Sequence, residues 1–182
     1  FSNKSYGNHL IEEALAEKNE SRKQQLLKKA LFHLQKAIHI VPSYVEAIFL
    51  TGNAQYLYNR DIEKAFEYYR KVLVMNFDNK KVLKNIEIML SECQNVNKRM
   101  KLLNELMNIS STNERIYYLM GKEYNRQKKY QKAIPFLKKA INFGPEKPGN
   151  YLELGLSFGY LGNFEKAIQF HRQALQYDPN NR

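Results

Sequence analysis

The strongest constraint on the fold of this chain is a pattern that repeats every 34 residues. Residues 114–147 and 148–181 carry the same residue types in one register. The matching pairs are Tyr117 and Tyr151, Gly121 and Gly155, Tyr124 and Phe158, Ala133 and Ala167, Ala140 and Ala174, and Pro145 and Pro179. Self-similarity at a fixed period of this size predicts a stacked array of supersecondary units.

The spacing within one period predicts a pair of antiparallel helices. Large side chains at Tyr117, Met120 and Tyr124 recur at i, i+3 and i+7, which places them on one helical face. A polar segment at 127–129 is too short for anything but a tight turn into a second helix. Pro145 cannot continue a helical hydrogen-bond ladder, so it is expected to end that second helix.

These motifs resemble the tetratricopeptide repeat. The resemblance is carried by an aromatic residue, a Leu-Gly pair, a second aromatic residue, two alanines and a proline at fixed positions, namely Tyr151, Leu154, Gly155, Phe158, Ala167, Ala174 and Pro179. It implies an all-α fold, an α-solenoid in which antiparallel helix pairs form a right-handed superhelix. It also implies a scaffold that binds proteins or peptides and is not an enzyme.

The period predicts one continuous array over residues 1–182, with units at about 5–45, 46–79, 80–113, 114–147 and 148–182. The first unit fits only if extra residues near 19–22 lengthen its hairpin. In the second unit Gly52 stands where a large residue is usual. In the third, Glu87 and Arg99 replace small residues, and helices are expected at about 81–93 and 97–108.

Composition excludes several classes of protein. A single cysteine rules out an internal disulfide framework, and the four histidines lack ligand spacing, so neither a metal nor another cofactor is expected. Cys93 and the tyrosines at repeat positions, among them Tyr56 and Tyr69, are expected in the core. No apolar run reaches the length of a membrane span. No set of side chains has the spacing of a catalytic site, and no small-molecule substrate is expected.

The net charge of +11 is unevenly distributed, since residues 80–147 hold 15 of the 29 Lys and Arg but 6 of the 18 Asp and Glu. In the resembled family a concave wall of first helices binds ligands. Carried over, that wall contains Lys81, Lys84, Asn85, Arg115, Tyr118, Lys122, Asn125 and Arg126. The functional interpretation is a groove for an extended acidic peptide or partner protein, with Lys and Arg as charged donors. A merely solvated basic face is an equally weighted alternative.

Two other functions stay open. The charge and the helical repeats are also compatible with RNA binding, although equivalent positions Lys84, Tyr118 and Leu152 share no common chemistry, which disfavours it. Alternatively, the segment is a soluble regulatory appendage of a larger enzyme. If that enzyme is a membrane protein, the periplasm is a possible location for the segment. Otherwise a location in the cytoplasm is slightly favoured. A start at Phe1 and a stop just after a repeat proline suggest a piece of a longer protein.

The position after each key alanine predicts how neighbouring units stack. Apolar side chains occur there at Ile134 and Ile168, and seven residues later at Ile141 and Leu175. Ile168 and Leu175 have no following unit in this sequence to cover them, so they are expected to be exposed, or to be covered by a partner, by a second copy of the chain or by a capping helix outside this sequence.

Overall fold

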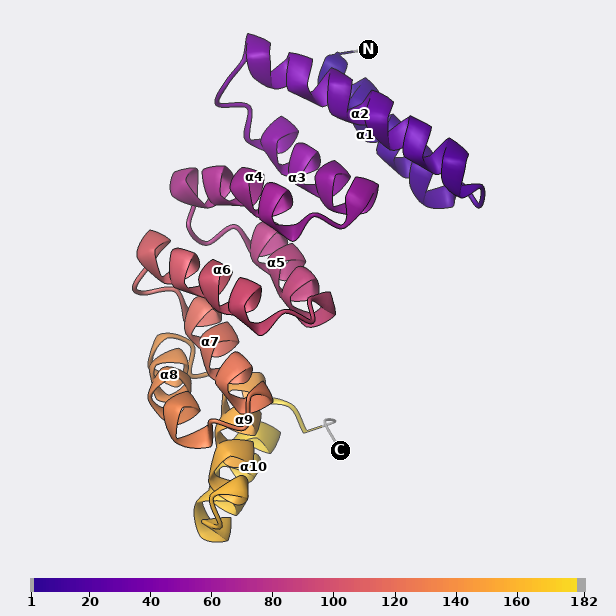
Figure 1. Ribbon diagram of the computed structural model, residues 1–182. Coiled ribbons are helices and arrows are strands. Elements are labelled where there is room, and N and C mark those ends of the chain that lie inside the picture. Colours follow the sequence, from indigo (N-terminus) through magenta and orange to yellow (C-terminus); the bar gives the residue numbers. More distant parts are fainter. Residues whose placement is uncertain (1, 180–182) are drawn as a thin grey trace. The chain divides into compact units, whose positions relative to one another are not determined.

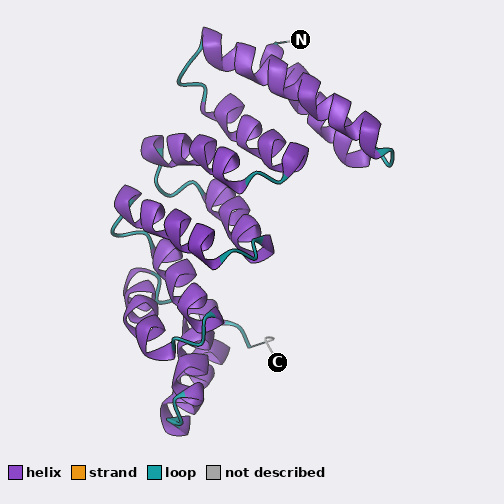
Figure 2. Ribbon diagram, viewed as in Figure 1, coloured by secondary structure: helices purple, strands orange, loops and turns teal. Residues whose placement is uncertain are grey.

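The computed structural model describes residues 2–179, and the whole of that range is built from helices and connecting loops, with no strand (Figure 2). The helices are α1 (Asn3–Ala16), α2 (Glu20–Ile40), α3 (Val45–Asn59), α4 (Ile62–Met75), α5 (Lys80–Glu92), α6 (Val96–Ile109), α7 (Glu114–Arg126), α8 (Tyr130–Phe143), α9 (Pro148–Tyr160) and α10 (Phe164–Tyr177) (Figure 1). The expected all-α, helical-repeat fold is confirmed.

The chain divides into two compact units, residues 1–94 with α1 to α5 and residues 95–182 with α6 to α10. Within the first unit α1 packs with α2 and α3 with α4, and α2 also contacts α3. Within the second unit the hairpins are α7 with α8 and α9 with α10, and α8 contacts α9. Each unit therefore buries its apolar side chains between successive hairpins, as a repeat array does.

Asparagine and aspartate side chains mark where many of these helices begin. The side-chain oxygens of Asn19, Asp61, Asn79, Asn95, Asn113 and Asn163 each accept a hydrogen bond from the backbone N–H three residues further on. Such a cap satisfies an amide that has no partner inside the helix and contributes about 0.5–2 kcal/mol. The starts of these six helices are thus encoded locally, whereas α3, α8 and α9 begin without a side-chain cap.

A glycine in the first helix allows two helices to cross closely in four hairpins. A Cβ atom added to Gly7, Gly52, Gly121 or Gly155 would lie within 2.9 Å of a side chain on the second helix. The sequence-based alignment was wrong about Gly52, which occupies the small-residue position rather than a large one. The cause is a longer first helix, because α3 has 15 residues whereas α7 and α9 have 13 each.

The predicted irregularities of the early units are otherwise confirmed. The first hairpin is lengthened, with a turn at 17–19 and a 21-residue α2. Helices α5 and α6 lie within one residue of the expected bounds. The expectation of a buried Cys93 was wrong, since this residue follows the last turn of α5 and is only half-buried. No described helix is long and apolar enough to cross a membrane.

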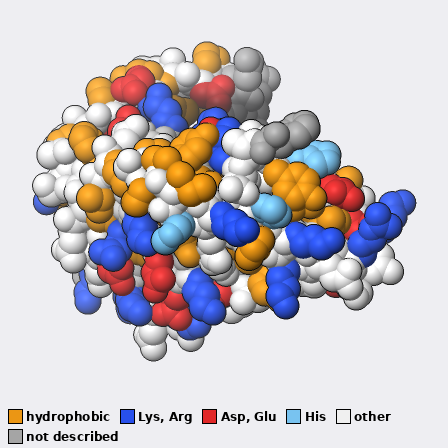
Figure 3. Space-filling model, turned by 90° about the horizontal axis from the view of Figure 1, so that it is seen from above, with side chains coloured by type: hydrophobic (Ala, Val, Ile, Leu, Met, Phe, Trp, Pro, Cys, Tyr) orange, Lys and Arg blue, Asp and Glu red, His pale blue; other side chains and the backbone are white. Residues whose placement is uncertain are grey.

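Charged side chains of both signs are visible on the face of the molecule seen in Figure 3. On the face seen in Figure 3, Lys and Arg side chains lie among acidic and apolar ones.

As expected, Ile168 and Leu175 are exposed, at 53% and 42% of their surface. Their counterparts on α8, Ile134 and Ile141, are half-buried against the core of the second unit.

Candidate functional site

A pocket of about 320 Å³ opens in the first unit on the side of its first helices. Four helices line it, because α1, α3 and α5 supply most of its wall and α4 supplies Tyr69. The aliphatic part of its lining consists of Ile11, Leu15, Leu57 and Ile88. Leu15 and Ile88 are 59% and 42% exposed, so this part is open to a ligand. Ligand sites commonly combine such an apolar wall with a few placed polar groups.

The polar groups at the base of the pocket form a triangle of hydrogen bonds. The Tyr69 hydroxyl donates to Asn53 Oδ1 at 2.7 Å, and Asn85 Nδ2 donates to the same oxygen at 2.8 Å and to the Tyr69 oxygen at 3.3 Å. Burial raises the pKa of Tyr69 to about 12, so this hydroxyl is protonated at neutral pH. The triangle ties α3, α4 and α5 together.

This triangle leaves hydrogen-bonding capacity at the pocket. Asn53 Nδ2 has no acceptor and Asn85 Oδ1 has no donor among the residues that the structure describes. Both side chains are only half-buried. An amide donor and an amide acceptor next to each other match the N–H and C=O groups of a peptide backbone or of a primary amide. The base of the pocket can therefore bind a neutral, amide-containing segment.

A charged pair closes one end of the pocket. Arg60 Nη1 donates to Glu92 Oε2 at 3.0 Å, and the Tyr56 hydroxyl donates to the same carboxylate oxygen. The Arg60 guanidinium lies 5.0 Å from the centre of the Tyr56 ring, within the range of a cation–π contact. Burial, and next the hydrogen bond to Glu92, raise the pKa of Tyr56. The pair leaves this end polar without net charge.

The eight groove residues predicted from the sequence are divided between the two units. Lys81, Lys84 and Asn85 belong to α5, where both lysines are exposed and Asn85 lines the pocket. Arg115, Tyr118, Lys122, Asn125 and Arg126 all belong to α7. Their joint action in one groove stays a prediction.

On α7, two cations flank one aromatic ring. The Arg115 guanidinium and the Lys122 ammonium lie 5.0 and 5.4 Å from the centre of the Tyr118 ring. These residues are three and four positions from Tyr118, so they share its helical face. The Tyr118 ring lies against Gly149 at the start of α9, where an added Cβ atom would be 3.5 Å from it, an ordinary van der Waals contact. Lys122 and Arg126 are exposed.

The side chain of Asn125 is buried and already hydrogen-bonded, unlike a side chain that is free to bind a ligand in a groove. It is 7% exposed, and its Nδ2 donates to the Glu153 carbonyl and to Glu153 Oε2, both at 2.9 Å. Its Oδ1 accepts from Ser157 Oγ at 2.7 Å. These bonds join α7 to α9, so a peptide that uses Asn125 would have to share or replace them.

Sequence reasoning missed several residues of the pocket. Tyr56 was expected in the core, but it is half-buried and reaches the pocket, whereas Tyr69 is in the core as expected, at 1% exposure. Nothing in the sequence pattern indicated Asn53 as a pocket residue. One available signal was the opposite charge of Arg60 and Glu92, which are 32 residues apart, close to one repeat, and therefore fall in neighbouring hairpin turns.

Proteins bind metal ions through characteristic groupings of side chains. Within residues 2–179, no three His, Cys, Asp or Glu side chains are grouped so that they could bind a metal ion. The surfaces described above offer hydrogen-bonding groups, cations and apolar side chains, and groups of these kinds can bind a ligand.

Comparison with known proteins agrees with this architecture. Tetratricopeptide repeat models match residues 114–146 and 151–181. No curated protein matches the sequence.

Among solved structures, MamA 41-end from Desulfovibrio magneticus RS-1 is similar over 100% of this chain and 98% of its own, with a TM-score of 0.63 and 16% identity. YrrB, described as "a TPR protein with an unusual peptide-binding site", is similar over 94% of this chain and 86% of its own, with a TM-score of 0.59 and 17% identity. At such identities the likeness concerns the fold. Two tetratricopeptide repeats are therefore matched in sequence, at residues 114–146 and 151–181, and helices α1 to α4 also pair as hairpins.

Proposed function

We propose that this chain is a protein-interaction scaffold that binds an extended peptide or a segment of a partner protein on the side formed by its first helices. The observation that carries the proposal is the pocket of the first unit. There an unused amide donor on Asn53 and an unused acceptor on Asn85 lie beside the aliphatic wall of Leu15 and Ile88. An extended peptide presents both a backbone amide and a side chain to such a surface.

The second unit supports an acidic partner. Arg115, Lys122 and Arg126 lie on α7 around and beyond Tyr118, and residues 80–147 carry most of the excess positive charge. Carboxylates on a peptide would accept charge-assisted hydrogen bonds from these donors. The complementary charge would mainly increase the rate of association and the selectivity for acidic sequences.

Selection from a displayed library of random 12-residue peptides tests the proposal. The selected sequences are expected to be enriched in Asp and Glu, and their synthetic versions should bind with lower affinity to Lys122→Glu/Arg126→Glu. The matched control is Lys28→Glu/Lys29→Glu on α2, which changes the net charge equally through exposed lysines in another part of the chain. Equal losses in the two variants would show attraction by net charge alone and contradict the groove.

The pocket has its own variant in the same experiment. Ile88→Asp introduces a charge into the aliphatic wall, whereas Val74→Asp introduces one at an exposed position of α4 outside the pocket. Reduced peptide affinity in the first variant alone is expected. If single-stranded RNA binds instead, with a steep dependence on salt, the chain is a nucleic-acid binder and the proposal fails.

A further inference from the structure

The aliphatic lining of the pocket in the first unit is anchored in the core of that unit. Ile11 is buried and belongs to the core cluster that α1, α2 and α3 form, and Leu57 packs against the same cluster. Leu15 and Ile88 are exposed, so they are accessible to a ligand. Close-packed interiors hold their side chains in fixed positions, so the inner part of this lining has a fixed shape. A fixed shape can discriminate between side chains of different size.

The volume of the pocket suits one large side chain. At about 320 Å³ it lies at the lower end of the range for ligand sites, which is about 300–1,000 Å³. Such a volume holds one large side chain together with the backbone unit that carries it.

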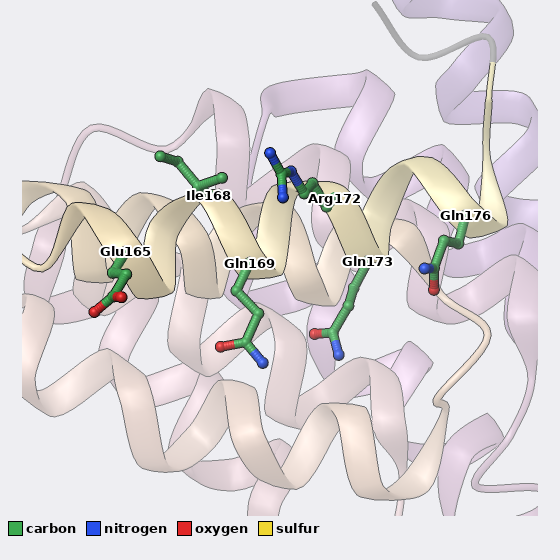
Figure 4. A pocket seen from close by; sticks show the side chains of 6 residues that line it. All are labelled: Glu165, Ile168, Gln169, Arg172, Gln173 and Gln176. Atoms are coloured by element: carbon green, nitrogen blue, oxygen red, sulfur yellow. The ribbon is translucent and has the colours of Figure 1, made fainter.

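Size alone does not define this pocket, because α10 carries another of about 330 Å³. Figure 4 shows the side chains that line the pocket on α10, with Ile168 and Arg172 on one side of the helix and Glu165, Gln169, Gln173 and Gln176 on the other. Ile168 is the one apolar residue among these six, and all six belong to a single helix. The pocket of the first unit instead combines aliphatic side chains from α1, α3 and α5. Of the two pockets, it is the one that can surround an apolar side chain.

The hydrogen-bond triangle strengthens the two amide groups that it leaves unused. Asn53 Oδ1 accepts two hydrogen bonds, from Tyr69 and from Asn85, and Asn85 Nδ2 donates two, to Asn53 and to Tyr69. Hydrogen bonds in such a network polarise one another. Asn53 Nδ2 thereby becomes a better donor, and Asn85 Oδ1 becomes a better acceptor. In an extended peptide the N–H and C=O groups of one residue point to the same side, so a single residue can meet both.

The side chain of that peptide residue leaves the extended backbone roughly at right angles to these two groups. Within the pocket the surface available to it is the aliphatic lining. An acidic side chain would lose water against apolar groups, which is costly for a charge without a partner. The cation that lines the pocket, Arg60, is already paired with Glu92, whose own charge repels a second carboxylate. The pocket therefore favours a large apolar side chain and disfavours Asp and Glu.

We propose that the pocket of the first unit recognises one position of the bound peptide and requires there a large apolar side chain, of the size of Leu, Ile, Met or Phe. The inference rests on the proposed function and adds to it, because an acidic ligand then contains one position at which Asp and Glu are excluded. Leu15 and Ile88 determine this preference, since they are the exposed part of the aliphatic lining.

A substitution scan of one selected peptide tests the inference. A synthetic 12-residue peptide from the displayed library carries a fluorophore, and each of its positions is replaced in turn by Ala and by Asp. Fluorescence anisotropy measures binding to the full chain. One apolar position is expected at which Ala lowers the affinity about tenfold or more, because about three buried carbon groups are lost. Asp at that position should lower the affinity further.

A double-mutant cycle assigns that position to the pocket. In Leu15→Ala/Ile88→Ala the same Ala substitution in the peptide should lower the affinity about threefold at most, because the surface that it contacts is missing. Ile40→Ala/Val74→Ala is the matched control, since both side chains are 70% exposed and lie outside the pocket. In this control the peptide substitution should cost as much affinity as in the wild type. Circular dichroism checks that both variants keep the helical content of the wild type.

The outcomes separate this inference from the proposed function. If no selected peptide binds saturably, the scaffold proposal fails and the inference fails with it. If peptides bind but every position tolerates Asp, the scaffold stands and the inference is overturned. The same holds if the apolar position costs as much affinity in Leu15→Ala/Ile88→Ala as in the wild type. The scan itself uses the wild-type chain, so it tests the inference even where a variant does not fold.

Discussion

Arg99 on α6 forms a bidentate ion pair with Glu123 on α7 in the interior of the second unit. Arg99 Nε donates to Glu123 Oε2 at 2.8 Å, and Arg99 Nη2 donates to Glu123 Oε1 at 2.9 Å. The side chains are 3% and 6% exposed. Gln127 Nε2 donates to Glu123 Oε1 as well, at 2.8 Å. The pair therefore joins α6 to α7 through two charged groups that are removed from water.

Removing one member of this pair should strongly destabilise the second unit. Glu123→Leu removes two charge-assisted hydrogen bonds from the buried guanidinium of Arg99, at an expected cost of about 3–5 kcal/mol in the free energy of unfolding. The double variant Arg99→Leu/Glu123→Leu should recover most of that loss, because two apolar side chains need no partner. Urea unfolding of the single and double variants measures both. A double variant as unstable as the single one would contradict this account.

The repeat pattern could not reveal this ion pair. In sequence Arg99 occupies the place of Ala133 and Ala167, so it was interpreted only as the loss of a small residue. Its partner is 24 residues away, which is neither a helical spacing nor the repeat period. A contact of this kind depends on the direction in which two helices pack, and a periodic pattern does not contain that information.

The hairpins themselves could be predicted, since periodicity, turn residues and prolines are local signals. Helices α7 to α10 begin and end close to where the two best repeats place them. The register of the second hairpin could not be predicted, because α3 is two residues longer than α7. The longer helix shifts Gly52 into the close crossing. An alignment by a fixed period has no means to detect a lengthened helix inside one unit.

Two glycines at equivalent positions should respond differently to alanine. A Cβ atom on Gly121 would lie 2.5 Å from Cγ of Leu137, which is fully buried and cannot move away. Overpacking of this kind costs about 1–3 kcal/mol. At Gly155 the nearest atoms belong to the ring of His171, an exposed side chain that can turn aside. Alanine there should cost less, since the ring can move, while the gain in helix propensity over glycine is the same at both positions.

Thermal unfolding of Gly121→Ala and Gly155→Ala tests this ordering. The first variant should melt at a clearly lower temperature than the second. Equal melting temperatures would mean that the two hairpins do not cross with the difference described.

Only part of the candidate site was accessible to sequence reasoning. The family pattern selected Asn85, which does line the pocket, and also Asn125, whose amide is used between α7 and α9. Both are asparagines on first helices, and what distinguishes them is the neighbouring side chain that each one meets. The pocket also depends on Tyr56, which is half-buried although a core position was expected.

The stability of the second unit should depend on the ionisation of Glu114. Burial, only partly offset by a hydrogen bond with Asn150 and by the charge of Arg115, raises the pKa of this carboxyl above its usual 4.5. Between the usual and the raised value the folded state holds more protons than the unfolded state. Stability is therefore lost as the pH rises through that interval, and the loss is complete above the raised pKa.

Glu114→Gln removes this dependence. Melting temperatures of the wild type and of Glu114→Gln, measured from pH 4 to pH 8, should differ by an amount that grows in favour of the variant as the pH rises and then levels off. A difference that stays constant over the whole range would show that Glu114 does not titrate with a raised pKa.

The hydrogen-bond triangle at the base of the pocket should contribute measurably to the first unit. Tyr69→Phe keeps the buried ring but removes the hydroxyl that donates to Asn53 and accepts from Asn85. The expected loss is about 0.5–1.5 kcal/mol in the free energy of unfolding, since Asn85 still donates to Asn53. The control is Tyr58→Phe on α3, whose hydroxyl has no hydrogen bond within the part of the chain that the structure describes. Urea unfolding should show a lower stability for Tyr69→Phe than for Tyr58→Phe. The triangle also orients the free amide groups of Asn53 and Asn85. Tyr69→Phe should therefore weaken the binding of selected peptides, whereas Tyr58→Phe should leave it unchanged. Identical behaviour of the two variants in both measurements would show that the triangle neither stabilises the unit nor shapes the pocket.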